Sequence, residues 1–184
     1  IKAMQNNGMW SENRGTNMLD TGVPFYDVYE TADGRWMSVG GLEPQFWDAM
    51  LAILASEGFE QIPDRNDPTN WPELRSRLAQ IFAGRSQAAW QELFDGTEAC
   101  VAPVVPLHEA AEHPHLKARG TYVEHAGQVQ AAPAPRFSAT PAQLSIPPRP
   151  TGADTREVLS DWGVSDVDSL ISDGIAVDNN ADSN

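Results

Sequence analysis

Glu43 occupies the position in this sequence that best suits acid–base chemistry. It follows Gly40 and Gly41, which close a stretch rich in aromatic and β-branched residues, and it precedes Pro44 at the first position of a predicted helix. A residue before proline is pushed to extended backbone, so we expect the carboxylate just outside the helix, near its positive end. The two glycines allow a ligand or another chain to approach the backbone closely. Two roles suit this position: proton exchange with a substrate, and complementing the helix dipole as a cap.

The histidines and the single cysteine do not complete a second site. His108 and His113 are five residues apart, whereas the zinc-binding helix motif H-E-x-x-H needs a spacing of four, and Pro114 then ends the helix. We therefore predict no metal site. Cys100 stands in an apolar segment, for which we predict a buried, inert thiol. One cysteine excludes a disulfide within the chain and favours a reducing, cytoplasmic compartment.

The charge of the chain argues against two classes of partner. The formal net charge is -14, and the segment 152–184 carries eight acidic residues against one basic residue, Arg156. Binding to nucleic acid or to an anionic membrane surface needs clustered lysine and arginine. The longest apolar run, residues 49–55, is too short to span a bilayer. We predict no nucleic-acid partner and no membrane partner, and we predict a disordered acidic tail over residues 176–184.

A hairpin and three amphipathic helices are predicted on either side of Glu43. Segments 25–31 and 35–39 have strand composition and flank an Asp-Gly pair, which is a strong hairpin signal. Helical periodicity follows in three places, with Asn70 as the predicted N-cap of the second helix. The apolar positions, which we interpret as core, are Phe46, Met50, Ile53 and Leu54; Trp71, Leu74, Leu78, Ile81 and Phe82; and Ala89, Trp90, Leu93 and Phe94.

The sequence pattern of the second half of the chain predicts shorter helices and strands. We expect a strand at 101–105, a helix at 106–112, a hairpin over 121–130 and two final helices at 155–162 and 166–171, the last with Ser165 as its N-cap. Residues 132–150 are rich in proline and alanine, which is typical of an extended crossover. The pattern predicts an α+β fold, with a small domain built on an antiparallel, hairpin-based sheet and packed helices.

Residues 8–47 closely resemble the α-methylacyl-CoA racemases, a family within the class III CoA-transferase (CaiB-BaiF) superfamily. The shared pattern is N-x-L-D-x-G-x-P-F/Y-Y, then D-G, then V-G-x-x-E-P-Q-F. Weaker similarity continues at 99–104, at 113–119 and at 134–137, so that the resemblance covers most of residues 8–162. The matching residues of the main pattern are Asn17, Leu19, Asp20, Gly22, Pro24, Phe25, Tyr26, Asp33, Gly34, Val39, Gly40, Glu43, Pro44, Gln45 and Phe46.

The resemblance implies a domain organisation. Members of the family are interlocked homodimers in which each chain has a Rossmann-like large domain and a small α+β domain. This sequence resembles the small domain with both crossover segments, without the first half of the large domain. By that comparison, 1–16 are the end of a large-domain helix and a crossover, 17–140 are the small domain, 141–175 are the crossover and helices that return to the large domain, and 176–184 are the tail.

The resemblance also implies an activity, the racemisation of 2-methylacyl-CoA thioesters through an enolate. The active site lies between the large domain of one subunit, which supplies a histidine and an aspartate, and the small domain of the other, which supplies the glutamate. Glu43 is thereby the predicted catalytic residue. Leu19, Tyr26 and Leu42 match positions near the acyl chain, although ordinary hairpin packing explains them equally well. No separate cofactor is implied, because CoA is part of the substrate.

Two other functions remain open. A CoA-transferase of the same superfamily acylates a large-domain aspartate and often has a run of glycines in the small domain, where this chain has only Gly40 and Gly41. The third reading is a non-catalytic fragment that folds or binds a partner without turnover, because the residues present complete no active site by themselves.

Overall fold

The structure is a computed structural model, and it describes residues 1–147 and 149–179. Contacts divide the chain into two compact units, residues 1–107 and the segment that begins at His108. The first unit contains α1 (Lys2–Asn6), β1 (Tyr26–Glu30), β2 (Trp36–Gly40), α2 (Pro44–Ser56), a 3-10 turn (Pro68–Asn70), α3 (Trp71–Phe82), α4 (Gln87–Phe94) and β3 (Val101–Val104). Helix α5 (Leu107–Ala110) lies at the division.

The first unit is built on an antiparallel sheet in the order β1-β2-β3. The β1–β2 hairpin pairs Glu30 with Trp36, and between them the turn is closed by a 2.8 Å hydrogen bond from Thr31 N to Arg35 O. Gly34 has a φ of +71°, a conformation that glycine adopts without steric cost. The Asp-Gly hairpin is confirmed, whereas the pairing of β3 with β2 is a tertiary contact that local sequence patterns did not predict.

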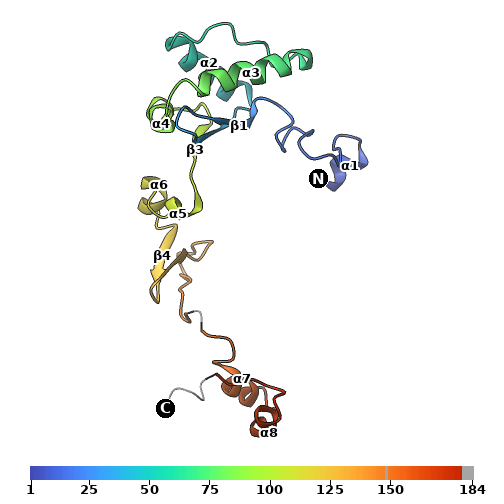
Figure 1. The fold of residues 1–184 in the computed structure, drawn as a ribbon, viewed down its shortest axis with the longest axis vertical. Coiled ribbons are helices and arrows are strands. Elements are labelled where there is room, and N and C mark those ends of the chain that lie inside the picture. Colours follow the sequence, from blue (N-terminus) through green and yellow to red (C-terminus); the bar gives the residue numbers. More distant parts are fainter. Residues whose placement is uncertain (148, 180–184) are drawn as a thin grey trace. The chain divides into compact units, whose positions relative to one another are not determined.

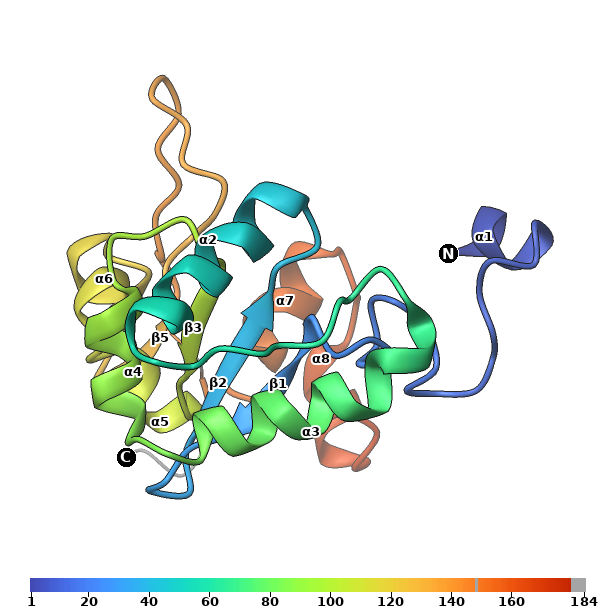
Figure 2. The same cartoon turned by 90° about the horizontal axis from the view of Figure 1, so that it is seen from above.

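Helices α2, α3 and α4 cover one face of this sheet (Figures 1 and 2). Alternation along the strands directs Tyr29, Met37 and Val39 into this core, where Tyr29 stacks on Phe82 with ring centroids 5.5 Å apart. The predicted core positions of α3 from Leu74 to Phe82 are buried, as are Trp90 and Phe94 of α4. Trp71, Ala89 and Leu93, which were also predicted as core, are only partly buried, so the periodicity identified the centre of each buried face but not its edges.

Two details of the helices differ from prediction. In α2 the buried residues are Trp47, Met50 and Leu54, whereas Phe46 and Ile53 are only partly buried, because the helix turns Trp47 toward Phe25 of the core. Asn70 is the N-cap residue of α3, as predicted, but its side chain makes no capping bond; its Nδ2 instead donates to the carbonyl oxygen of Asp64 over 3.1 Å.

The second unit contains α6 (Pro114–Ala118), the antiparallel hairpin of β4 (Tyr122–His125) and β5 (Gln128–Ala131), α7 (Thr155–Asp161) and α8 (Val167–Ser172). Strands β4 and β5 and helices α7 and α8 agree with the predicted hairpin and final helices, whereas α6 was not predicted. It begins at Pro114, because proline suits the first turn of a helix. The N-cap of α8 is Asp166, at a φ of +68°, and not Ser165 as predicted. The prediction missed the left-handed residue that starts the helix one position later.

The beginning of the predicted disordered tail makes defined contacts. Asn179 donates from its side chain to Thr151 O, and Arg156 Nε donates to Asp178 Oδ2 over 3.2 Å. Residues 180–184 of that predicted tail lie outside the described residues. The antiparallel sheets and packed helices confirm the α+β class, and the boundaries predicted at 16, 140 and 175 stay a prediction.

Candidate functional site

Glu43 lies where the sequence placed it, between the end of β2 and the start of α2. It is the N-cap residue, with φ −72° and ψ 141°, and Pro44 opens the helix. Its side chain is exposed and makes no capping hydrogen bond to the helix. The carboxylate therefore lies near the positive end of a 13-residue helix but does not cap it. Its oxygens remain available to bind another group.

The glycines before Glu43 form a tight turn. Leu42 N donates to Gly40 O over 2.9 Å, a three-residue turn that redirects the chain from β2 into α2. Gly41 is buried, and a Cβ there would lie 3.4 Å from Trp47 Cα. The group that closely approaches the Gly41 backbone is therefore α2 of the same chain and not a ligand. Gly40, by contrast, is partly exposed and borders a pocket.

That pocket, of about 300 Å³, opens on the sheet face that the three helices leave uncovered. Two of the three predicted acyl-chain residues, Leu19 and Tyr26, line it, and Leu42 does not; Tyr26 and Leu42 both pack against the hydrophobic core. The pocket is lined by Leu19, Thr21, Tyr26, Asp27, Val28, Ser38, Val39, Gly40 and Cys100. The structure therefore brings Leu19 and Tyr26 together beside the end of β2, three residues before Glu43.

The loop that carries Leu19 is held by Asn17 and Asp20. Asn17 is 7% exposed, and its N and Nδ2 donate to the Asp20 carboxylate over 2.6 and 2.7 Å. These bonds from Asn17 lower the pKa of Asp20 below its ordinary value. Gly22 completes the loop, because a Cβ there would lie 2.4 Å from Asn17 O. The N-x-L-D-x-G pattern therefore presents Leu19, which is 49% exposed, at the pocket.

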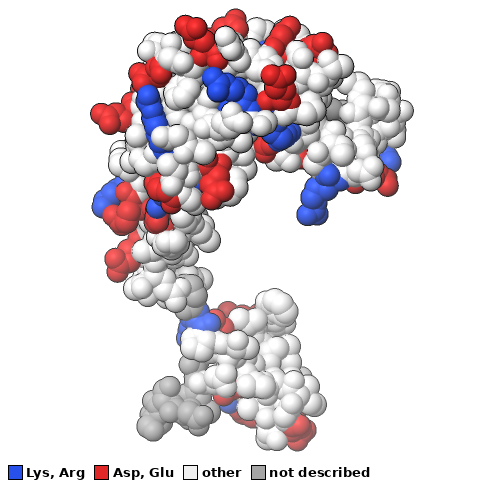
Figure 3. All heavy atoms as spheres, turned by 45° about the horizontal axis from the view of Figure 1, so that its top comes forward, with Lys and Arg blue, Asp and Glu red and all other residues white. Residues whose placement is uncertain are grey.

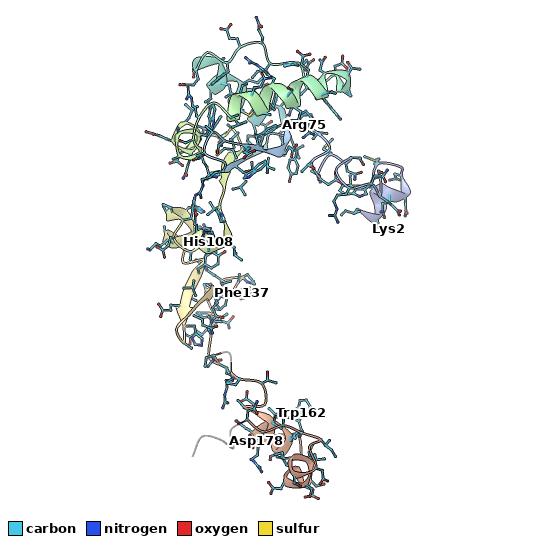
Figure 4. All side chains as sticks on the ribbon, viewed as in Figure 1. Lys2, Arg75, His108, Phe137, Trp162 and Asp178 are labelled. Atoms are coloured by element: carbon cyan, nitrogen blue, oxygen red, sulfur yellow. The ribbon has the colours of Figure 1, made fainter. Side chains whose placement is uncertain are left out.

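Arg75 of α3 connects the helix layer to the pocket rim, and sequence reasoning missed it. Its guanidinium pairs with the Asp27 carboxylate, and Nη2 donates to Thr21 O over 2.9 Å. Arg75 is labelled in Figure 4 at the junction of α3 with β1. Burial lowers the pKa of Arg75. Both contacts span more than forty residues, which places them beyond any local pattern.

Cys100 is exposed and lines the pocket, so the predicted buried thiol is wrong. Its carbonyl accepts a 2.9 Å hydrogen bond from Gly40 N, and its φ is +50°. The apolar neighbours Ala99 and Val101 do turn inward, but the pairing of β3 with β2 places Cys100 opposite Gly40 on the uncovered face. Side chains alternate between the two faces of the sheet, and the pairing of β3 with β2 places the Cys100 side chain on the exposed face.

The part of the chain that the structure describes carries neither a metal-ligand cluster nor a membrane-spanning helix. Among residues 1–147 and 149–179, no group of three or more histidine, cysteine or acidic side chains is arranged to hold a metal ion. In the same part of the chain, no helix is both long and apolar enough to cross a membrane. Acidic side chains spread over the visible surface of the first unit, with fewer basic ones (Figure 3).

Comparison with known proteins identifies a family. Residues 2–155 match the model of CoA-transferase family III. The chain is 42% identical to the α-methylacyl-CoA racemase of Mus musculus over 160 residues, and 40% identical to that of Homo sapiens over 159 residues. These alignments cover 86% and 85% of this chain but 42% and 41% of the relatives. The chain therefore spans about two-fifths of the length of the curated relatives it matches.

The fold is also found in a solved structure. The crystal structure of the hypothetical protein Rv3272 from Mycobacterium tuberculosis matches with a TM-score of 0.58 at 16% sequence identity. The match covers 85% of this chain and 43% of that chain. At this identity, the likeness concerns the fold alone.

Proposed function

Because this chain belongs to CoA-transferase family III, we propose that it supplies the small-domain part of an α-methylacyl-CoA racemase site, with Glu43 as the carboxylate that supports a catalytic histidine. Identity of 40–42% to two proteins named as racemases supports the reaction class. The observation that carries the role of Glu43 is its exposed carboxylate, which stands at a helix N-terminus without capping it.

The proposed reaction exchanges the proton on the carbon between a methyl branch and a thioester. One base removes this weakly acidic proton, negative charge collects on the thioester oxygen, and an acid on the opposite face returns a proton. The large domain of a second subunit would supply a histidine and an aspartate. Glu43 would contact that histidine and hold its orientation and protonation state, which requires a carboxylate that is not committed to its own helix.

The pocket beside β2 is proposed to receive the acyl chain. Leu19 and Tyr26 offer apolar surface for a branched hydrocarbon, and the volume of about 300 Å³ suits part of such a chain. Leu42 would contribute indirectly, because it packs against the core beneath the turn. CoA itself is substrate, so the proposal includes no separate cofactor. A homodimer and a cytoplasmic location belong to the same proposal.

A hybrid enzyme tests this function. In the hybrid racemase, the matching segment of this chain replaces the corresponding 160 residues of the mouse enzyme. Deuterium incorporation at the α-carbon of a 2-methylacyl-CoA in D₂O is then measured with Glu43 and with Glu43→Gln. We expect exchange in the first and a loss of about a hundredfold or more in the second, the range typical of general acid–base groups.

Glu73→Gln is the matched control, because Glu73 is an exposed glutamate in the first turn of α3, next to a proline. It removes the same charge from a helix N-terminus elsewhere, so its exchange rate should be unchanged. Equal losses of exchange rate in both variants would show that Glu43 only complements the dipole of its helix. A folded hybrid without exchange would contradict the racemase proposal itself.

Acyl transfer is the second candidate, favoured by the family description and by a CaiB/baiF CoA-transferase family protein of Caenorhabditis elegans that is 28% identical over 113 residues. The same hybrid separates the two reactions when it is given an acyl-CoA and a free carboxylic acid. Formation of the new thioester without α-proton exchange would select the transferase.

A further inference from the structure

Arg65 is a buried cation next to the turn that leads into Glu43. It lies in the loop between α2 and the 3-10 turn and is 8% exposed. Its guanidinium carbon lies 5.0 Å from the ring centre of Phe25 and 5.2 Å from that of Trp47. Cation–π contacts of this length offset part of the cost of removing the charge from water. The arginine is therefore held between two aromatic rings of the core.

The guanidinium binds two consecutive carbonyl groups of the turn. Nη1 donates to Gly41 O, and Nη2 donates to Leu42 O over 3.1 Å. The flanking carbonyls are satisfied by the backbone, because Gly40 O accepts from Leu42 N and Glu43 O accepts from Trp47 N. Arg65 therefore donates to the carbonyls of Gly41 and Leu42, the two residues between the end of β2 and the N-cap of α2.

Arg65 is itself fixed in place. Trp71 Nε1 donates to Arg65 O over 2.8 Å, and the Trp71 ring packs edge-on against Phe25 with centroids 5.9 Å apart. Burial lowers the pKa of Arg65, and the charges of Asp48 and Asp64 oppose that shift. The Trp71 hydrogen bond and the two rings therefore hold Arg65 in place, and the two carboxylates favour its charged form.

We propose that Arg65 is a positioning residue for the racemase reaction: its two hydrogen bonds fix the Gly41–Leu42 backbone and thereby the place of the Glu43 carboxylate. The part that concerns catalysis rests on the proposed function. A planar fork of donors matches two neighbouring carbonyls, whereas lysine offers a single point of charge. Precision is needed because a displacement of about 1 Å can cost about a hundredfold in rate.

NMR spectra of the full 184-residue chain test the structural half without any activity. The carbonyl ¹³C signals of Gly41 and Leu42 should shift in Arg65→Met, which removes both donors, and should shift less in Arg65→Lys, which keeps one donor group. Arg85→Met is the matched control, because Arg85 also lies over two aromatic rings, Phe59 and Trp90, but bonds to Glu57. It should leave both carbonyl signals unchanged.

The hybrid racemase tests the catalytic half of the proposal. The measured quantity is the ratio of deuterium incorporation with inversion to incorporation with retention, which does not depend on the fraction of folded enzyme. Deuterium incorporation with inversion needs both bases, whereas incorporation with retention needs one. We expect the ratio of inversion to retention to fall by about ten- to a hundredfold in Arg65→Met, with KM unchanged. Arg65→Lys should recover part of the loss, and it also serves if Arg65→Met does not fold.

The outcomes separate this inference from the proposed function. Shifted carbonyl signals with an unchanged ratio would make Arg65 a purely structural residue and overturn the proposal. Unshifted signals in both folded Arg65 variants would overturn it at the first step. A hybrid that lacks exchange with Arg65 intact would remove the catalytic role together with the proposed function, while shifted signals would still show that Arg65 holds the turn.

Discussion

The side-chain Nε2 of Gln87 donates a 2.7 Å hydrogen bond to the carbonyl oxygen of Trp36, which joins the first residue of α4 to the first residue of β2. The same amide donates to Val104 O over 3.1 Å, and its Oε1 accepts from Arg35 Nε over 2.7 Å. Gln87 is 6% exposed, so one buried side chain connects two strands, the hairpin turn and a helix.

Replacing Gln87 with leucine should therefore destabilise the first unit. The substitution keeps the volume but removes three partly buried hydrogen bonds, and we expect a loss of about 2 kcal/mol. Urea denaturation of the chain measures this as a lower midpoint with an unchanged slope. Gln80→Leu on the exposed surface of α3 is the control and should leave the midpoint nearly unchanged. Equal midpoints for both variants would show that the Gln87 network contributes nothing.

The stability of the chain should fall at acidic pH through Asp20. Its carboxylate accepts two bonds from Asn17, which lower its pKa in the folded state. This stabilisation is complete above the unfolded pKa of about 3.9 and is lost as the pH falls through the lower folded value. Urea midpoints measured from pH 6 down to pH 3 should decline less steeply for Asp20→Asn than for the unchanged chain. Parallel curves would contradict this account of the loop.

Substitution of Gly22 should disrupt the loop that presents Leu19. An added Cβ would lie 2.4 Å from Asn17 O and 2.5 Å from Thr16 C, and both are backbone atoms that have little freedom to move. We expect Gly22→Ala to cost about 3 kcal/mol, at the upper end for overpacking. In Gly40→Ala the nearest contact would be 3.6 Å, to Cys100 O, so its unfolding midpoint should change little. Comparable midpoints for the two variants would argue against the steric explanation.

The Cys100 thiol should react without unfolding. Because the side chain is exposed at the pocket, a maleimide should label the folded chain at a rate within about tenfold of that in denaturant. Mass spectrometry of a time course gives both rates, and Cys100→Ser controls for reaction elsewhere. Protection of the thiol by several orders of magnitude in the folded chain would restore the buried site first expected for it.

Local patterns were sufficient for most of the elements and for the position of Glu43. Apolar periodicity and the Asp-Gly turn identified the β1–β2 hairpin and the core faces of α3 and α4. The Glu43–Pro44 pair set the extended N-cap, because proline restricts the residue before it. The ordered motif from Asn17 to Phe46 was specific enough to indicate the family that residues 2–155 match.

The contacts between those elements could be read only from the tertiary structure. Arg65 and Gln87 bind carbonyls 24 and 51 residues away, and no periodic signal in their own segments marks them. Cys100 became exposed because β3 pairs with β2 and not because of its neighbours in sequence. Helix propensity and turn chemistry act over a few residues, so the sequence by itself determined where strands and helices form around Glu43. Packing of distant segments determined which side chains hold Glu43 and which line the adjoining pocket.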